Sequence, residues 1–121
     1  MEQIKLFDSE LKLMELVWEK APVTAKELAA LAEERIGWNK NTTYTILKKL
    51  IDKKAVNREE PNFRCTPLIT KGLVRRAEAE SLIDKLFDGS IKTFFATFLE
   101  SEKLTSDEVE ELKRMIDKSG E

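Results

Sequence analysis

Short polar side chains share one side of the segment formed by residues 38–52. If this segment is helical, Asn41, Tyr44 and Thr45 lie on the same face, with Lys48 further along. Amide, hydroxyl and phenol groups near the start of a helix can hydrogen-bond the base edges of DNA, and lysines can bind its phosphates. Asn, Thr and Tyr are weak helix formers, so an exposed face built from them gains nothing locally. This face therefore favours nucleic-acid recognition.

The other side of the same segment is apolar. Its members recur at three- and four-residue spacing, which is typical of a helix face turned into a core: Thr43, Ile46, Leu47, Leu50 and Ile51. We interpret the segment as a recognition helix. The alternative is an ordinary exposed helix face, although such a face more often carries Glu and Lys in i,i+4 pairs.

The composition excludes most catalytic chemistry. The chain has no histidine and one cysteine, so it cannot form Ser/His/Asp, Cys/His or His-Glu-x-x-His sites, and one cysteine cannot build a zinc site. The four glycines are isolated and form no phosphate-binding loop. A small enzyme would need a pocket of converging acids, and no such pattern is visible. We therefore expect no enzymatic activity, metal or cofactor.

Length and hydropathy indicate a protein of the cytoplasm. The 121 residues suit one domain, or a small domain followed by an oligomerisation segment. No apolar run approaches a membrane span, and the N-terminus lacks the apolar core of a signal peptide. Cys65 cannot form an internal disulfide, which fits a reducing compartment.

Positive charge is concentrated in the middle of the chain. Residues 38–64 contain seven Lys or Arg against three acids, a local net charge of +4, although the whole chain carries −2. From residue 71 onward, nine basic residues stand against twelve acids. Residues 38–64 can therefore bind the phosphates of a nucleic acid, although the segment from residue 71 onward is acidic.

Two further helices are predicted before the polar segment. Asp8 or Ser9 can cap the first, which ends at Ala21-Pro22. Its inner face is formed by Leu11, Met14, Val17 and Trp18, with Trp18 as a core anchor.

Thr24 and Glu27 form a capping-box pattern for the second helix, and Gly37 ends it. Its inward positions are Leu28, Ala29, Ala32 and Ile36. Asn39 then caps the third helix, so the order is that of a helix-turn-helix.

A small β-hairpin should follow. Residues 55–58 and 63–66 are short alternating runs, and Pro61 and Asn62 favour a turn between them. Arg58 and Arg64 would lie near a DNA backbone, whereas Glu59 and Glu60 argue against deep contact by the tip. Cys65 should fill a buried strand position. The predicted fold is mainly α with a small β-hairpin wing, in which residues 1–69 form a winged helix-turn-helix.

Residues 70–121 should form three helices. Thr70 caps the first, residues 88–90 break it near Phe87, and Thr105 caps the last. About fifty residues seldom bury a stable core alone, so these helices either fold back on the first domain or pair with a second chain. We favour pairing, because twofold dimers are the commonest assemblies. The expected dimerisation residues are Leu82, Leu86, Phe94, Phe95, Phe98, Leu99, Val109, Leu112 and Ile116.

The order of these motifs resembles that of a known family. The matching pieces are residues 11–18 followed by Pro22 and Thr24-Ala25, the run Trp38-Asn39-Lys40-Asn41-Thr42-Thr43-Tyr44-Thr45, the wing, residues 81–90 with their break Leu86-Phe87-Asp88-Gly89-Ser90, and residues 104–112. Over nearly its full length the chain resembles the penicillinase-repressor (BlaI/MecI/CopY) family of bacterial transcriptional regulators. The resemblance implies a homodimeric repressor that binds dyad-symmetric operator DNA through an N-terminal winged helix and blocks transcription.

The resemblance also places DNA contacts at Asn41, Thr42, Tyr44, Thr45 and Lys49. Basic residues are usual at positions 41 and 44 in the antibiotic-resistance members, so their operator sequence does not transfer to this chain. Together with the phosphate-binding cations, the expected DNA-binding residues are Lys40, Asn41, Thr42, Tyr44, Thr45, Lys48, Lys49 and Arg64.

Members of the antibiotic-resistance branch are inactivated when a membrane-embedded metalloprotease sensor cuts an Asn-Phe bond in the fifth helix. This chain has Thr97-Phe98 at that place, which makes the bond the candidate cleavage site. The copper-responsive branch uses a C-terminal cysteine cluster, and this chain has none.

A winged helix that contacts another protein is the alternative function. It would fit the overall negative charge and needs no lysine cluster. The short polar residues of the third helix argue against it, because the centres of protein interfaces prefer aromatic and aliphatic anchors.

Overall fold

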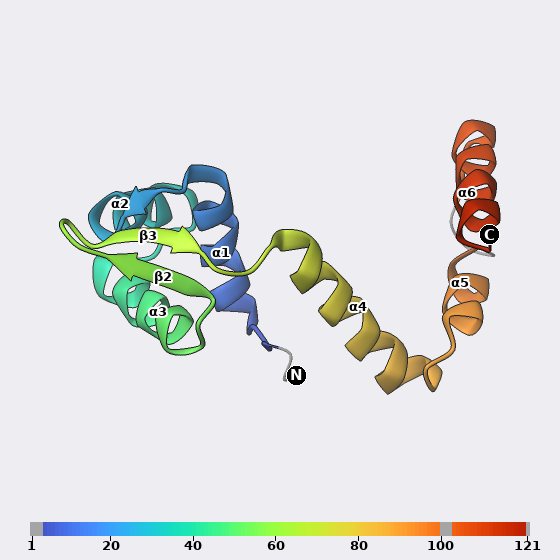
Figure 1. Ribbon diagram of the computed structural model, residues 1–121, viewed down its shortest axis with the longest axis horizontal. Coiled ribbons are helices and arrows are strands. Elements are labelled where there is room, and N and C mark those ends of the chain that lie inside the picture. Colours follow the sequence, from blue (N-terminus) through green and yellow to red (C-terminus); the bar gives the residue numbers. More distant parts are fainter. Residues whose placement is uncertain (1–3, 100–102, 121) are drawn as a thin grey trace. The chain divides into compact units, whose positions relative to one another are not determined.

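The computed structural model describes residues 4–99 and 103–120 and confirms a mainly helical fold with a small sheet (Figure 1). It divides into two compact units, residues 1–79 and 80–121. The elements are α1 (Asp8–Lys20), β1 (Val23–Thr24), α2 (Ala25–Arg35), α3 (Lys40–Asp52), β2 (Val56–Glu59), β3 (Arg64–Pro67), α4 (Lys71–Phe87), α5 (Ile91–Leu99) and α6 (Ser106–Ser119).

The predicted hairpin is part of a three-stranded antiparallel sheet in the order β1-β3-β2. Cys65 on the central strand lies opposite Val23 of β1 and Arg58 of β2. The sequence did not reveal β1, because two residues are too few to show an alternating pattern. This third strand ties the wing to the start of α2.

The core of the first unit lies between the sheet and α1–α3. Helix α1 packs against α2, α3 and β3, and α2 packs against α3. Leu13, Leu28, Leu47 and Leu50 are almost completely buried. Each such side chain contributes about 1.5–3 kcal/mol through burial. Cys65 is also buried, as predicted, and the loss of solvent raises the pKa of its thiol to about 11.

The cap of α1 differs from the prediction. The helix begins at Asp8, and Phe7 precedes it without a side-chain cap. Instead, the carboxylate of Glu10 accepts the backbone N–H of Phe7 at 2.7 Å. The proposed caps, Asp8 and Ser9, were therefore wrong, because both residues lie within the helix and Glu10 satisfies the preceding amide.

The buried stripe of α1 is also rotated from the predicted one. Its buried members are Glu10, Leu13, Met14, Leu16 and Val17. Leu11 and Trp18 are only half-buried, although the Trp18 Nε1–H donates to the carbonyl of Ile69 at 2.9 Å. Trp18 thus anchors the segment that leads into α4 from the edge of the core.

The caps predicted for the next two helices are confirmed. Thr24 Oγ1 accepts from the Glu27 amide at 3.1 Å, and the Glu27 carboxylate accepts from the Thr24 amide at 3.2 Å. The Thr24 hydroxyl also donates to the Glu27 carboxylate, at 2.8 Å. This bond and the bond from the Thr24 amide favour the charged carboxylate and lower the pKa of Glu27. Gly37, with φ +86°, follows the end of α2, and Asn39 Oδ1 accepts from the Thr42 amide at 2.8 Å.

Helices α5 and α6 belong to the second unit, and neither contains a buried residue. Thr105 Oγ1 accepts from the Glu108 amide at 3.1 Å and caps α6 as predicted. Gly89, with φ +79°, lies in the predicted break between α4 and α5. In the part of the chain that the structure covers, no helix is both long and apolar enough to cross a membrane.

A buried ion pair joins α1 to the residue that follows α3. Glu10 is 1% exposed, and its Oε1 accepts from Lys53 Nζ at 2.6 Å. Lys53 Nζ also donates to the carbonyl of Lys5 at 2.8 Å and lies 4.5 Å from the Phe7 ring centre. Oε2 has no hydrogen-bond partner in the described structure, so Lys53 provides the main compensation for the buried charge.

Removing Lys53 should therefore destabilise the first unit. Lys53→Met leaves the Glu10 carboxylate without its cation, and we expect a loss of about 2–4 kcal/mol in the free energy of unfolding, measured by urea denaturation. Lys12→Met, at an exposed position of α1, is the control and should change it by less than about 0.5 kcal/mol. Equal stability of the two variants would contradict this role.

The α2 cap should contribute to the acid sensitivity of folding. The pKa of Glu27 is lower in the folded chain than its ordinary value of 4.5. Its contribution is therefore complete above pH 4.5 and is lost as the pH falls through the folded pKa. Urea midpoints measured from pH 7 to pH 3 should fall less steeply for Glu27→Gln than for the parent. The control Glu33→Gln, on the same helix, should keep the parent profile.

Candidate nucleic-acid interface

Helix α3 has the two faces that its sequence indicates. Thr43, Ile46, Leu47 and Leu50 are buried, and Ile51 is half-buried. The expected DNA-binding residues of this helix are all exposed: Lys40, Asn41, Thr42, Tyr44, Thr45, Lys48 and Lys49. Tyr44 is 41% exposed, a large value for an aromatic residue on a helix that packs against two others.

The polar groups at the start of α3 differ in their freedom to bind a ligand. Asn39 is engaged as the cap. Thr45 Oγ1 donates to the carbonyl of Asn41 at 2.9 Å, so its proton is already used. No hydrogen bond engages the Asn41 carboxamide or the Tyr44 phenol within residues 4–99 and 103–120. These two side chains can therefore bind another molecule without breaking an internal bond.

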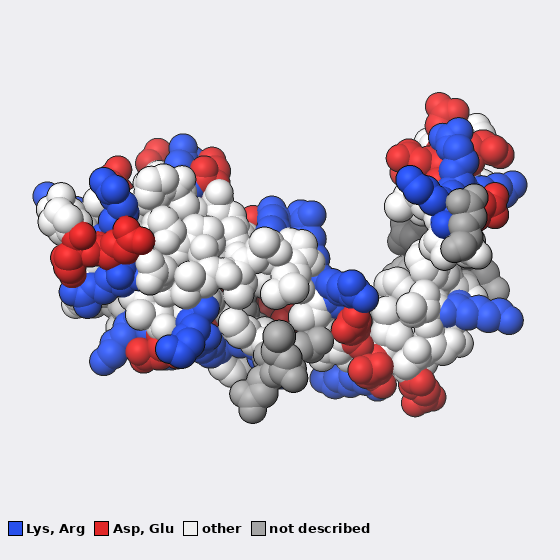
Figure 2. All heavy atoms as spheres, in the orientation of Figure 1, with Lys and Arg blue, Asp and Glu red and all other residues white. Residues whose placement is uncertain are grey.

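Cations gather over α3, at the lower left of Figure 2, whereas acids gather near the turn between β2 and β3. Lys40, Lys48 and Lys49 are exposed and form no ion pair with any residue that the structure describes. Their charge is available to an anion such as phosphate.

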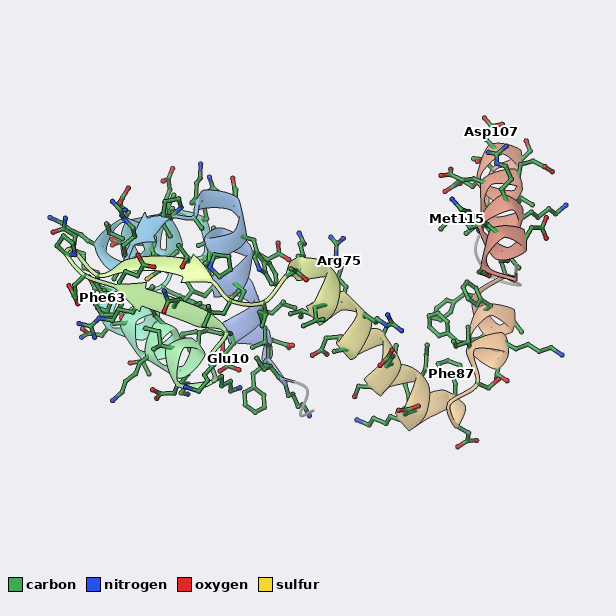
Figure 3. All side chains as sticks on the ribbon, in the orientation of Figure 1. Glu10, Phe63, Arg75, Phe87, Asp107 and Met115 are labelled. Atoms are coloured by element: carbon green, nitrogen blue, oxygen red, sulfur yellow. The ribbon has the colours of Figure 1, made fainter. Side chains whose placement is uncertain are left out.

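Two of the seven cations counted in the basic middle are neutralised within the fold. Lys53 is paired with Glu10. Arg58 donates to Glu60 Oε1 through Nε at 3.1 Å and Nη2 at 2.8 Å, and it lies 3.9 Å from the centre of the Phe63 ring. Figure 3 shows Phe63 on the wing and Glu10 on α1. The basic surface is therefore narrower than the local charge of the sequence indicates.

Arg64 is exposed on the central strand, between Thr24 of β1 and Glu59 of β2 in register. Its positive charge contributes to the low pKa of Glu27. Glu27 of α2 therefore partly balances the charge of Arg64, whereas the α3 lysines are in no described ion pair.

Glu10 is the residue of this region that the sequence pattern did not reveal. Acidic side chains are almost always exposed to solvent, so the sequence predicts an exposed side chain for an acid in the first turn of a helix. The available signal was its spacing, since Glu10 stands three, four and seven residues before Leu13, Met14 and Val17.

The second unit carries the candidate dimerisation residues. Leu86 and Ile116 are 62% and 64% exposed, and Phe95 is 45% exposed. Phe94 is half-buried among other rings, with centroids 5.4 Å from Phe87 and 5.7 Å from Phe95. The remaining members are exposed (Leu82, Phe98, Leu99) or half-buried (Val109, Leu112).

An open apolar groove of about 790 Å³ runs between α5 and α6. Its apolar lining includes Ile91, Phe95, Leu99, Leu104, Leu112 and Ile116, and Figure 3 marks Met115, another lining residue, on α6. The candidate cleavage residues Thr97 and Phe98 lie in α5 and are exposed, and Thr97 Oγ1 donates to the carbonyl of Thr93 at 2.9 Å.

The chain is similar to known proteins over most of its length. The chain is 24% identical over 115 residues to the penicillinase repressor of Bacillus licheniformis, covering 93% of this chain and 90% of that protein. It is 23% identical over 116 residues to the methicillin resistance regulatory protein MecI of Staphylococcus aureus, with 94% of each chain covered.

Two solved structures are similar in fold. The solution structure of the DNA binding domain of the repressor BlaI is 28% identical, with a TM-score of 0.54, over 60% of this chain and 93% of that one. The monomeric form of Bacillus licheniformis BlaI in complex with the blaP half-operator is 29% identical, with a TM-score of 0.52 and the same coverage.

The family model described as "Penicillinase repressor" matches residues 6–118, which is most of the chain. The similarity therefore extends through both compact units and beyond the part covered by the solved structures. This protein belongs to the penicillinase repressor family.

Proposed function

We propose that this chain is a DNA-binding transcriptional repressor that binds a dyad-symmetric operator as a homodimer and blocks transcription. The observation that carries the proposal is the outer face of α3. Among the described residues, none hydrogen-bonds the amide and phenol groups of this face or forms an ion pair with its lysines. The opposite face of the helix is buried. Such a helix is held rigidly while its polar face can enter a major groove.

The groups on this face divide by their chemistry. Lys40, Lys48 and Lys49 would bind phosphates and fix the position of the helix. Asn41, Tyr44 and Thr45 would read base edges, because they lie within the first two turns of α3. Thr42 borders this surface, and Arg64 would contact the backbone from the wing. Bound near a promoter, the protein would exclude RNA polymerase.

The relatives support this assignment. One is named a penicillinase repressor, and a similar solved structure is that of the BlaI monomeric form in complex with the blaP half-operator. A half-operator implies a second half, which matches a protein that presents two copies of α3. Residues 1–69 would then bind DNA and residues 70–121 would join the two chains.

A second copy of the chain is the proposed partner of the C-terminal helices. Neither α5 nor α6 buries a residue, and most of the side chains that line the groove between them are apolar. Water would contact this surface in a single chain, at a cost of about 25 cal/mol for each Å² of apolar area. Pairing of two such units would bury it and place two DNA-binding faces on one operator.

Relief of repression by proteolysis is part of the same proposal. A cut between Thr97 and Phe98 would separate α6 from most of α5 and divide the groove lining. The agent would be a membrane-embedded metalloprotease sensor. The bond lies inside a helix, so the helix would have to open locally before cleavage.

Salt dependence tests the DNA-binding assignment. Affinity for duplex DNA should fall with salt at a log–log slope of about −0.9 for each phosphate contacted. Lys48→Ala and Lys49→Ala should each reduce the slope by about 1, measured by fluorescence anisotropy. Lys12→Ala removes the same charge from α1 and should keep the parent slope. A slope near zero for the parent would favour the protein-binding alternative.

Charge placed in the groove tests the dimer. Phe95→Asp and Ile116→Asp should each raise the dissociation constant of the dimer at least about 30-fold, as loss of an interface anchor worth about 2 kcal/mol does. Sedimentation velocity measures the change. Leu73→Asp alters a residue that is 61% exposed outside the groove and serves as the control. A parent chain that remains monomeric at high concentration would refute the pairing.

A further inference from the structure

The outer face of α3 has hydrogen-bonding constraints that limit which bases it can read. Among its three candidate base-reading side chains, Thr45 is the most restricted. A carbonyl can only accept, so the 2.9 Å contact between Thr45 Oγ1 and the Asn41 carbonyl uses the hydroxyl proton. Thr45 can then offer DNA only an acceptor and its methyl group.

Unlike Thr45, Asn41 has a side chain that can both donate and accept a hydrogen bond with DNA. Its side chain is exposed, and no described residue hydrogen-bonds its carboxamide. The carboxamide presents a donor NH2 group and an acceptor oxygen in a single plane. In the major groove, adenine alone offers the complementary pair on one base, an acceptor at N7 and a donor at N6.

The position of Asn41 also suits a base contact. It is the second residue of α3, and residues in the first turns of a helix in the major groove are those that reach base edges. Lys48 and Lys49 lie two turns later, toward the end of the helix. The bidentate partner of guanine would be an arginine or a lysine, and only Lys40 is a candidate for it in the first turn.

We propose that Asn41 is a specificity-determining residue that reads one adenine in each operator half-site through N7 and N6. Thr45, one turn further along, faces the next bases as an acceptor and favours cytosine N4, adenine N6 or the thymine methyl group. The proposal rests on the proposed function, since it assigns base identity to the same face of α3.

The experiment begins with a duplex selected from a random library by the full-length protein. Each adenine of the selected site is replaced singly by 7-deazaadenine, which lacks the N7 acceptor but keeps base pairing. For the parent, one adenine in each half-site should show a loss in affinity of about 3- to 10-fold, as expected for one hydrogen bond. The two sensitive adenines should be related by the dyad of the site.

The penalty should depend on Asn41. In Asn41→Ala and in Asn41→Asp, which cannot donate to N7, the 7-deazaadenine duplex should bind within 2-fold of the unmodified one. Asn41→Asp guards against a folding defect, because a carboxylate near a helix N-terminus is favourable. Lys12→Ala, at an exposed position of α1, should show the full penalty.

The failures of the two proposals are distinguishable. If no site is selected and the salt slope is near zero, the DNA-binding function itself is wrong. If a dyad-symmetric site is selected with a steep salt slope, but no adenine is sensitive to 7-deaza replacement, only the Asn41 assignment fails. It fails equally if the sensitivity persists undiminished in Asn41→Ala and Asn41→Asp.

Discussion

A single carboxylate connects three parts of the first unit. Glu10 accepts the amide of Phe7 before α1 and the ammonium group of Lys53 after α3, and it is 1% exposed. Removing such a charge from water is unfavourable unless its partners are held in place. The start of α1, the end of α3 and the segment at Lys5, whose carbonyl also binds Lys53, are therefore fixed together. Together with the packing of α3 against α1 and α2, this junction holds the outer face of α3 in place.

The groups available to bind DNA depend on which side chains are already bonded within the protein, as well as on residue type. Lys53 and Arg58 are engaged with acids, whereas Lys40, Lys48 and Lys49 are in no described ion pair. Thr45 is bonded to its own helix, and the Asn41 carboxamide is not held by any described group. Internal bonds thus leave fewer cations of the basic region available to DNA, and the available ones lie mainly on the outer face of α3. On this face, the proposed phosphate-binding and base-reading groups occupy separate positions along the helix.

The second unit presents the opposite case, in which side chains typical of a core remain exposed. Phe95, Leu86 and Ile116 are each at least 45% exposed, and the groove between α5 and α6 is open. A segment of this size has too little interior to cover such residues by itself. The protein is proposed to bind a twofold-symmetric DNA site. A second copy of the chain carries the same apolar surface and could cover it.

Residue types and their spacing were enough to predict the order of the helices, the caps at Thr24, Asn39 and Thr105, and the buried face of α3. These features depend on residues within one or two turns of each other, so local spacing is sufficient to predict them. The folded chain was needed to show that Glu10 is buried, that Lys53 and Arg58 are neutralised, and that β1 joins the wing. The Glu10–Lys53 pair and the β1–β3 pairing join residues about forty positions apart, and a lysine paired through the fold has the same sequence signature as a solvated one.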